Sequence, residues 1–188
     1  MGLDYTDGCV NFRDVGGYVN LILEKDVLPE GKIFRGGSID YIENLGEIGQ
    51  VHSIINLRNR PDYQNFAVDY FHFPMSNKVE KYDTTQKEVK IWLNNILKVF
   101  ENQALKSPLL IHCLSGKDRT GIVVAALLLI LGIDENTIQE EYLLSLGEVK
   151  TEWIQQSISG MQVIDHYFNR VDLNKVRENI LLEDKGNQ

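Results

Sequence analysis

The sequence predicts an α/β fold with one central sheet of four or five mostly parallel strands, flanked by helices. Short apolar runs typical of buried strands, such as Val51 to Leu57, alternate along the chain with longer segments of helical periodicity. A second run of this kind, Pro108 to Ile111, leads through a polar stretch directly into the apolar run Ile122 to Leu131. That order predicts a strand, a loop and a buried helix.

The N-terminal part is expected to carry little regular structure. Residues 1–20 are predicted to be mostly irregular, with a turn at Gly16-Gly17. Short strands should follow within residues 20–34. Ser38 or Asp40 is then expected to cap a short helix.

Two strands and a long helix should follow. Val51 to Leu57 and Val68 to Pro74 are β-branched or aromatic runs bounded by polar residues, as in core strands. Thr85 and Glu88 have the spacing of a capping box, which predicts the start of a helix. Its apolar residues share one helical face: Val89, Trp92, Leu93, Ile96, Val99 and Phe100.

The C-terminal third is predicted to be helical. Gly132 should end the buried helix, and Asp134 should cap the next one. Further apolar residues recur at helical spacing and are expected to pack on the sheet: Trp153, Ile158, Met161, Ile164 and Phe168. A last helix is expected over 173–182, followed by a loose tail from Glu183. Residues 1–188 are therefore expected to form a single domain, with helices from 134–182 packed on its core.

Composition narrows the classes of function. The 188 residues are 43% hydrophobic and 24% charged, which is ordinary for a globular domain. A net charge of −8 argues against nucleic acid or an anionic membrane as a bulk partner. The apolar run Ile122 to Leu131 is only ten residues long, too short to cross a bilayer, so no integral membrane association is expected. The sequence carries no indication of an oligomeric state.

Cysteine use and the first residues bear on the compartment. Cys9 and Cys113 are too few for a disulfide framework and are not spaced as a metal-ligand pair. The chain start lacks the basic and apolar segments of a signal peptide. A cytoplasmic location is expected, and secretion without a cleaved signal stays open.

The stretch from His112 to Gly121, called the central loop below, carries the chemistry. A loop between a strand and a helix gathers backbone N–H groups and the helix N-terminus around one concavity, which binds anions. Helix N-termini and nearby cations lower the pKa of a cysteine and favour the thiolate. Cys113 is therefore predicted to be the nucleophile, and Arg119 to grip two phosphate oxygens with its planar fork. Gly116 permits the backbone turn.

The other residues of the central loop have expected roles as well. The residues predicted to bind the phosphate are Leu114, Ser115, Gly116, Lys117, Asp118, Arg119 and Thr120. Thr120 is expected to donate its hydroxyl to the thiolate, and His112 to orient the loop. A phosphoryl group held over the sulfur favours displacement through a phosphocysteine intermediate.

The central loop resembles the signature of the cysteine-dependent phosphatases, the protein-tyrosine and dual-specificity superfamily: His112-Cys113, five residues, then Arg119-Thr120-Gly121. The form Gly-Lys-Asp-Arg-Thr-Gly is closest to the bacterial and fungal tyrosine-phosphatase-like family, which includes triple-specificity protein and phosphoinositide phosphatases. The stretches Asn11 to Gly17 and Ile54 to Arg58 also fit that family, so the resemblance covers roughly residues 9–132.

This resemblance implies a tyrosine-phosphatase-like fold and a metal-independent phosphatase without a cofactor. Its substrate would be a phosphotyrosine protein, a phosphoinositide, or both. Lys117 favours the phosphoinositide, because an extra cation suits a headgroup with several phosphates. Two other functions stay open: a phosphate-binding module without turnover, and oxyanion chemistry such as arsenate reduction. The last usually needs a resolving cysteine, for which Cys9 is the sole candidate.

The general acid has two equal candidates, Asp118 and Asp83, with Asp62 third. Asp83 lies thirty residues before Cys113, about the distance found in related tyrosine and dual-specificity phosphatases, although no Trp-Pro-Asp surrounds it. Asp118 lies inside the loop, as in the myotubularins. The alternative role of Asp83 is that of a helix-capping neighbour. Asp118 would instead pair with Lys117 or Arg13.

Three further charged residues are expected to support the site. Arg13 and Asp14 are predicted to form a local ion pair that holds the N-terminal loop, with direct substrate contact as the alternative. Arg58 follows a strand at its carboxyl end, where ligands of open α/β sheets bind. It is a candidate to face the site, with an exposed surface charge as the alternative.

Overall fold

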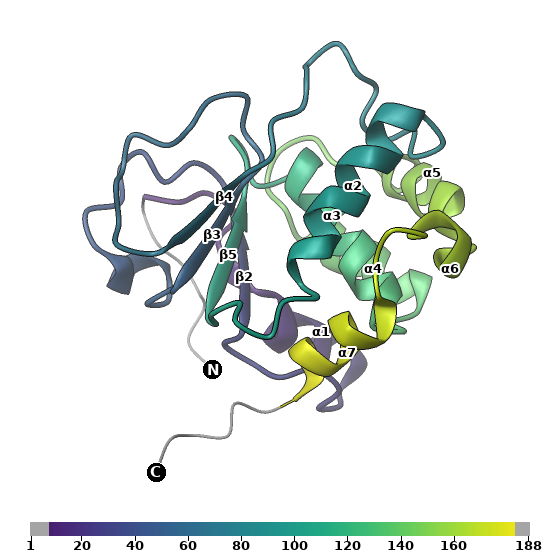
Figure 1. Cartoon of the computed structure of the whole chain (residues 1–188), viewed down its shortest axis with the longest axis horizontal. Coiled ribbons are helices and arrows are strands. Elements are labelled where there is room, and N and C mark those ends of the chain that lie inside the picture. Colours follow the sequence, from purple (N-terminus) through teal and green to yellow (C-terminus); the bar gives the residue numbers. More distant parts are fainter. Residues whose placement is uncertain (1–7, 183–188) are drawn as a thin grey trace.

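The computed structural model describes residues 8–182, and a five-stranded sheet lies at its centre (Figure 1). The strands are β1 (Arg13–Asp14), β2 (Ile33–Gly36), β3 (Ser53–Asn56), β4 (Asp69–His72) and β5 (Leu109–His112). Their order is β1-β2-β5-β3-β4; β1 runs antiparallel to β2, and all other neighbours are parallel. The prediction of an α/β fold with a mostly parallel sheet is confirmed.

The helices gather on one side of the sheet, as Figure 1 shows. They are α1 (Val15–Leu23), α2 (Lys87–Val99), α3 (Asp118–Ile130), α4 (Glu135–Leu143), α5 (Thr151–Met161), α6 (Ile164–Tyr167) and α7 (Leu173–Leu181). Helix α3 lies against β2 and β5 and contacts α2, α4, α5 and α7. Its side chains are apolar nearly all round and buried, as the run Ile122 to Leu131 predicts. Within residues 8–182, no helix has the length and apolar character required to span a bilayer.

Each face of the sheet has its own core, because successive side chains of a strand point to opposite faces. Ile33, Ile55 and Ile111 point toward the helices. Phe34, Ile54 and Leu110 point the other way. The second face is covered by a segment that contains no long helix. The buried residues of this segment are Ile39, Ile42, Ile48 and Val51. Only a short 3₁₀ helix, η1 (Leu45–Ile48), lies in this cover among the described residues.

The central position of β5 determines where the central loop lies. β5 pairs with β2 on one side and with β3 on the other, so His112 lies level with Gly36 and Asn56. The chain passes from this end of β5 into Cys113 and then into α3. Ligands of open α/β sheets bind at such carboxyl ends. The expected strand, loop and helix are therefore present around Cys113.

The prediction of mostly irregular structure over residues 1–20 is wrong from Arg13 onward, and its part for residues 1–7 lies outside the described residues. Val15–Leu23 forms helix α1, and Gly16-Gly17 lies in its first turn rather than in a separate turn. The carboxylate of Asp14 caps this helix by accepting from the Gly16 N–H at 3.1 Å, and it also accepts from the Gly31 N–H at 2.7 Å. Two adjacent glycines are typical of a turn. Here a helix is favoured instead, because Asp14 caps its start and Val15 and Val19 are buried on one of its faces.

Two predicted helix starts are also wrong. Ser38 and Asp40 cap no helix; η1 begins after Asn44, whose side chain caps it, and Asp40 pairs with Arg58 instead. Thr85 does not form a capping box, because its hydroxyl donates to Asp83 at 2.5 Å. Helix α2 therefore begins later, at Lys87, without a side-chain cap.

The C-terminal helices follow the sequence more closely. Asp134 caps α4 as predicted, and α7 fits the expected last helix. The apolar run from Trp153 to Phe168 divides into α5 and α6, and α5 packs mainly on α3 and α4 rather than on the sheet. The predicted tail from Glu183 lies outside the described residues.

Asp134→Ala should lower the free energy of unfolding by about 1 kcal/mol at pH 7, as expected for a lost N-cap. The wild-type carboxylate accepts from the Thr137 N–H at 3.0 Å and the Thr137 hydroxyl at 2.7 Å, and these bonds lower the pKa of Asp134. The stabilisation is therefore full above the unfolded pKa of about 4 and is lost as pH falls through the lower folded value. Urea unfolding of the wild type and the variant at pH 7 and near pH 3 measures the loss of stability and its dependence on pH.

Asp26→Ala is the matched control, because Asp26 is exposed and has no hydrogen-bond partner among the described residues. It should leave stability nearly unchanged at either pH. A loss in Asp134→Ala that is the same at both pH values would contradict the capping role.

Candidate active site

The central loop makes a tight turn between β5 and α3. Gly116 has a φ of +65°, which only glycine adopts readily, and a Cβ there would collide with the backbone of Gly36 and Gly37. Cys113 follows β5 directly, is 4% exposed, and donates its backbone N–H to the Gly36 carbonyl at 3.4 Å. The turn therefore rests against the end of β2, and a side chain at 116 would separate them.

Three successive carbonyls of the central loop are bound from outside the loop. The Leu114 carbonyl accepts from the Ser38 N–H at 2.9 Å. The Ser115 carbonyl accepts from the Asn11 side-chain amide at 2.8 Å. The Gly116 carbonyl accepts from Nη2 of Arg35 at 3.0 Å. In a trans peptide the N–H points opposite to its carbonyl. These contacts therefore turn the next three N–H groups the other way.

Those N–H groups are free to bind an anion. Within residues 8–182, no hydrogen bond uses the backbone N–H of Ser115, Gly116 or Lys117. They lie just before α3, a helix of 13 residues whose first N–H groups add a partial positive charge. Successive unpaired N–H groups at a helix N-terminus form a typical site for phosphate.

Arg119 contacts the connection between β4 and α2. Its Nη2 donates to the Met75 carbonyl at 3.1 Å and to the side chain of Asn77. Its Nε is buried without a protein partner in the described chain. The guanidinium thus lies in the first turn of α3 with one donor engaged and another unpaired.

Thr120 is fully buried, and its hydroxyl has no hydrogen-bond partner among residues 8–182. The expected hydrogen bond from this hydroxyl to Cys113 is therefore not formed in this structure. An unpaired buried hydroxyl is uncommon, because it forgoes its bonds to water.

Asp118 belongs to a chain of hydroxyl contacts. Oδ1 of Asp118 accepts from the Tyr82 hydroxyl at 2.5 Å, and the hydroxyls of Tyr82 and Tyr142 lie 2.7 Å apart. Burial raises the pKa of Tyr82 far above its ordinary value, so its hydroxyl stays protonated and donates. Lys117 lies 3.9 Å from the same Oδ1. Of the two pairings considered for Asp118, the structure places Lys117 next to it and Arg13 elsewhere.

Asp83 lies in the turn before α2. Its Oδ1 accepts from the N–H and the hydroxyl of Thr85, and its Oδ2 from the Gln86 side chain. These hydrogen bonds, that of the Thr85 hydroxyl first, lower the pKa of Asp83. The geometry matches the alternative role of a neighbour that supports the start of a helix. Its neighbour in sequence, Tyr82, contacts the central loop instead.

His112 and Asp62 form a buried pair behind the central loop. Nε2 of His112 lies 2.9 Å from Oδ2 of Asp62, and both side chains are fully buried. Asp62 also accepts from Nη1 of Arg58 at 3.1 Å and from the Tyr70 hydroxyl at 3.1 Å. The third acid candidate is thus sealed from the loop concavity and orients the imidazole of His112.

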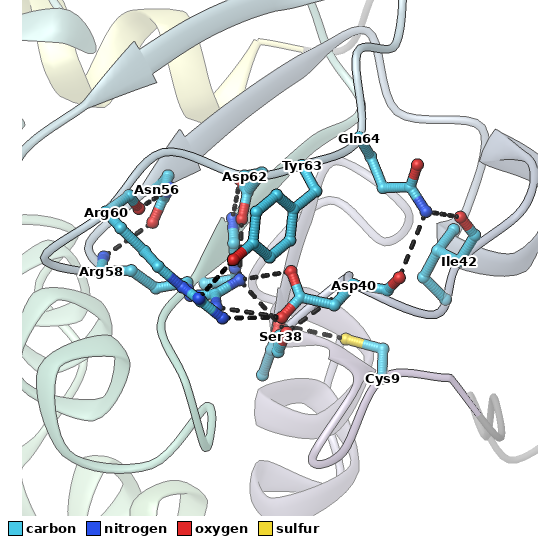
Figure 2. Close-up of polar contacts among 12 residues, drawn as sticks. Cys9, Ser38, Asp40, Ile42, Asn56, Arg58, Arg60, Asp62, Tyr63 and Gln64 are labelled. Carbon is cyan, nitrogen blue, oxygen red and sulfur yellow. Dashed lines mark hydrogen bonds and ion pairs between the residues drawn. The ribbon is translucent and has the colours of Figure 1, made fainter.

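Arg58 is neither free to face a ligand nor a surface charge, because its side chain is 3% exposed. Figure 2 shows it between Asp40 and Asp62, with Ser38 below. Nη1 and Nη2 of Arg58 donate to the two carboxylate oxygens of Asp40 at 2.7 and 3.0 Å. The hydrogen bond from Arg58 is the main cause of the lowered pKa of Asp40. Arg58 therefore reaches the loop through its neighbours: through Asp62 and His112, and through Ser38, whose hydroxyl accepts from Nη1 of Arg58 at 3.2 Å.

The predicted ion pair between Arg13 and Asp14 is replaced by longer-range contacts. Nε of Arg13 donates to Oε1 of Glu141 at 2.9 Å, while Asp14 caps α1. Oε2 of Glu141 accepts from Nη1 of Arg35 at 2.5 Å. Burial acts to raise the pKa of Glu141, but the charges of Arg35 and Arg13 outweigh it and lower that pKa.

Cys9 lies close to the central loop. Its thiol donates to the Gly37 carbonyl at 3.5 Å, and its sulfur packs against Gly36, which also bonds the N–H of Cys113. Burial raises the pKa of Cys9 to about 12. The sequence alone did not place Cys9 here, and the raised pKa makes it a weak nucleophile.

A cavity of about 340 Å³ adjoins Asp118. Its lining residues are Glu80, Lys81, Tyr82, Lys117, Asp118, Trp153 and Gln156. The rings of Tyr82 and Trp153 lie 5.5 Å apart between centroids and form one wall. Two cations and two carboxylates surround the opening, beside the loop concavity.

Four residues of this site were not predicted from the sequence: Asn11, Arg35, Tyr82 and Glu141. Glu141 carried a signal, because it lies on the buried face of α4 beside Ile138 and Tyr142. An acidic residue on such a face requires a buried partner. Arg35 also stood out, as a charge at the end of an apolar strand. Asn11 opens the stretch Asn11 to Gly17 that fits the family, but no local pattern indicated the contacts of Asn11 or Tyr82, since these join distant parts of the chain.

The sequence is similar to that of known proteins. The model of the Tyrosine phosphatase family matches residues 5–183. Triple specificity protein phosphatase PtpB of Mycobacterium tuberculosis is 46% identical over 55 residues, which span 26% of this chain and 20% of PtpB. The match therefore covers about a fifth of that relative's length.

Solved structures share the fold. The core catalytic domain of the PP-IP phosphatase Siw14 from S. cerevisiae matches with a TM-score of 0.55 and 21% identity, over 77% of this chain and 91% of that one. The human tyrosine phosphatase-like serine/threonine/tyrosine-interacting protein matches with a TM-score of 0.51 and 12% identity, over 73% and 95%. With a family model that matches nearly its whole length, the chain belongs to the Tyrosine phosphatase family.

Proposed function

We propose that this chain hydrolyses phosphomonoesters through a phosphocysteine intermediate on Cys113. The observation that carries the proposal is the row of three unpaired N–H groups beyond Cys113, at the start of α3. They supply fixed donors for the oxygens of a phosphoryl group. Such preorganised donors stabilise the charge of the transition state without rearranging during the reaction.

The proposed reaction has two steps. The Cys113 thiolate attacks phosphorus and forms the S–P bond while the bond to the leaving oxygen breaks, and that oxygen takes a proton from a general acid. Water then attacks the phosphocysteine, gives a proton to the same group, and releases phosphate and the thiolate. Arg119 binds oxygens of the transferred group in both steps.

We assign the general acid to Asp118. Its side chain is 28% exposed, lines the cavity beside the loop, and belongs to the first turn of α3. Oδ1 is engaged by Tyr82, which leaves Oδ2 to carry the proton. Asp83 is turned toward Thr85 and Gln86, and its lowered pKa disfavours the protonated form. Asp62 is buried behind the loop.

The two alternative functions have less support. A binding module has no need of a cysteine beside unpaired amides and a carboxylic acid. Arsenate reduction needs a second thiolate, and the raised pKa of Cys9 keeps that thiol protonated near neutral pH.

The cations around the cavity support a proposal for the substrate class. Lys117 and Lys81 both line it, beside the phosphate concavity. This supports a substrate with more than one phosphate, such as a phosphoinositide headgroup. The aromatic wall of Tyr82 and Trp153 also suits the ring of a phosphotyrosine. We propose that the site accepts phosphoinositides and phosphotyrosine. Lys117 should contribute more to the hydrolysis of a phosphoinositide than to that of phosphotyrosine.

Cys113→Ser should reduce hydrolysis of p-nitrophenyl phosphate by several orders of magnitude while inorganic phosphate still binds, because an alcohol ionises far less readily than a thiol. Steady-state kinetics and isothermal titration measure the two quantities. Wild-type activity should persist in excess EDTA. Radiolabelled phosphate trapped on a residue other than Cys113 would overturn the assignment, and phosphate binding without turnover by the wild type would favour the binding module.

Asp118→Asn should lower kcat for an alkyl phosphate by about 10²–10⁴-fold. It should spare much of the rate on p-nitrophenyl phosphate, whose leaving group departs without a proton. The alkaline decline of the rate should also disappear. Asp83→Asn is the matched control and should leave both substrates and the pH profile nearly unchanged. The assignment fails if Asp83→Asn shows the selective loss, or if Asp118→Asn loses both substrates in the same ratio.

Lys117→Ala should slow hydrolysis of a phosphoinositide with several phosphates more than that of p-nitrophenyl phosphate. Each added phosphate gains from a cation in a partly desolvated pocket. Lys175→Ala, at an exposed position on α7, is the control for overall charge and should affect neither. Comparison of kcat/KM for the two substrates decides the matter. Equal losses for both would show that Lys117 only supports the loop.

A further inference from the structure

Arg35 is a fully enclosed charge next to the central loop. It lies in β2, and its side chain has no exposed surface. Nη1 donates to Oε2 of Glu141 at 2.5 Å, and Nη2 donates to the Gly116 carbonyl at 3.0 Å. The planar fork therefore joins a carboxylate of α4 to the turn of the loop. A lysine has no rigid fork that makes both contacts at these positions.

The Gly116 carbonyl lies at a flexible point of the loop backbone. Glycine has more backbone freedom than any other residue, and Gly116 has a positive φ. A flip of the peptide between Gly116 and Lys117 would exchange the directions of its carbonyl and N–H. The carbonyl would then point into the concavity and repel a phosphate. The bond from Arg35 opposes that flip, since it binds the carbonyl on the far side.

The charges around Arg35 add an electrostatic contribution. Arg13 and Arg35 carry two positive charges against one negative charge on Glu141, so the buried group has a net charge of +1. Burial and the charge of Arg13 lower the pKa of Arg35 to about 10, which leaves it charged at neutral pH; the charges of Glu141 and Cys113 act in the opposite direction. The excess positive charge therefore interacts with Cys113, from the side of the loop opposite to solvent.

Glu141 is itself fixed from a second direction. Arg13 binds Oε1 with its Nε, and its Nη2 donates to the Glu141 carbonyl at 2.8 Å and to the Ser145 hydroxyl at 3.1 Å. The carboxylate thus stays in place even without Arg35. Conversely, Arg35 keeps its partner if Arg13 is removed.

We propose that Arg35 is a positioning residue that holds the Gly116 peptide in the orientation required for phosphate binding. This inference rests on the proposed function, because it assigns a role in the same reaction. Arg35 touches neither substrate nor the reacting atoms, and it acts through the loop backbone, by its contact with the Gly116 carbonyl.

The test compares Arg35→Met with Arg13→Met. Each substitution removes one positive charge from the same buried group and leaves Glu141 with one arginine. Only Arg35→Met removes the donor to Gly116. We expect Arg35→Met to lower kcat for p-nitrophenyl phosphate by about 10–100-fold, the range seen at metal sites when the hydrogen-bond partners that orient the ligands are removed. It should also weaken competitive inhibition by inorganic phosphate. Arg13→Met should reduce kcat and phosphate inhibition much less.

Thermal unfolding of the two variants shows whether they differ in stability. A similar loss of activity in both would overturn the proposal, because the shared change of charge or packing would then explain it. Normal kcat and phosphate inhibition in Arg35→Met would also overturn it. If Arg35→Met fails to fold, Arg35→Lys keeps the buried charge without the fork. It should still show a reduced kcat, and a wild-type kcat would overturn the proposal.

Failure of the proposed function gives a different result. In that case the wild type itself would not hydrolyse p-nitrophenyl phosphate. Binding of inorganic phosphate, followed by isothermal titration, would still compare the two variants. Weaker binding in Arg35→Met than in Arg13→Met would support the role of Arg35 in shaping the loop, and equal binding would overturn it.

Discussion

The arrangement at the active site depends on one constraint: the backbone N–H groups after Cys113 have to remain unpaired in the folded chain. Carbonyls left free in so tight a turn would compete for them. The structure avoids this because Ser38, Asn11 and Arg35 bind three successive carbonyls from outside. These donors come from the N-terminal segment and from the end of β2. The proposed phosphate recognition therefore relies on chain segments far from the loop in sequence.

The same constraint explains how an acidic protein provides a site for an anionic group. The chain carries a net charge of −8, but exposed charges are screened beyond about 8 Å at physiological salt. The charges and dipoles next to the site are fixed and only weakly screened. Arg13 and Arg35 lie behind the loop, and α3 points its N-terminus at it. Asp40, Asp62 and Glu141 are each engaged by donors, which limits their effect on a bound phosphate.

Sequence reasoning succeeded where the signal was contiguous. β5, the central loop and α3 form one uninterrupted stretch, so the positions of Cys113 and Arg119 followed from apolar runs and one motif. It failed where a contact joins distant residues. Arg35 and Gly116 are 81 residues apart, and Arg13 and Glu141 are 128 apart. Local rules also misled at Gly16-Gly17 and at Thr85, because two glycines or one hydroxyl can serve a helix or a turn equally well.

The contact of Arg119 with the connection between β4 and α2 has a thermodynamic consequence. Nη2 of Arg119 binds the Met75 carbonyl and the side chain of Asn77. An anion that accepts from Nη2 in place of Asn77 has to displace the Asn77 side chain. Anion binding and the position of residues 75–77 are therefore thermodynamically coupled. Suppose that a second ligand draws this connection away from Arg119. That ligand then changes the affinity for the anion by some factor, and the anion changes the affinity for that ligand by the same factor. A segment outside the loop thereby becomes an effector of it.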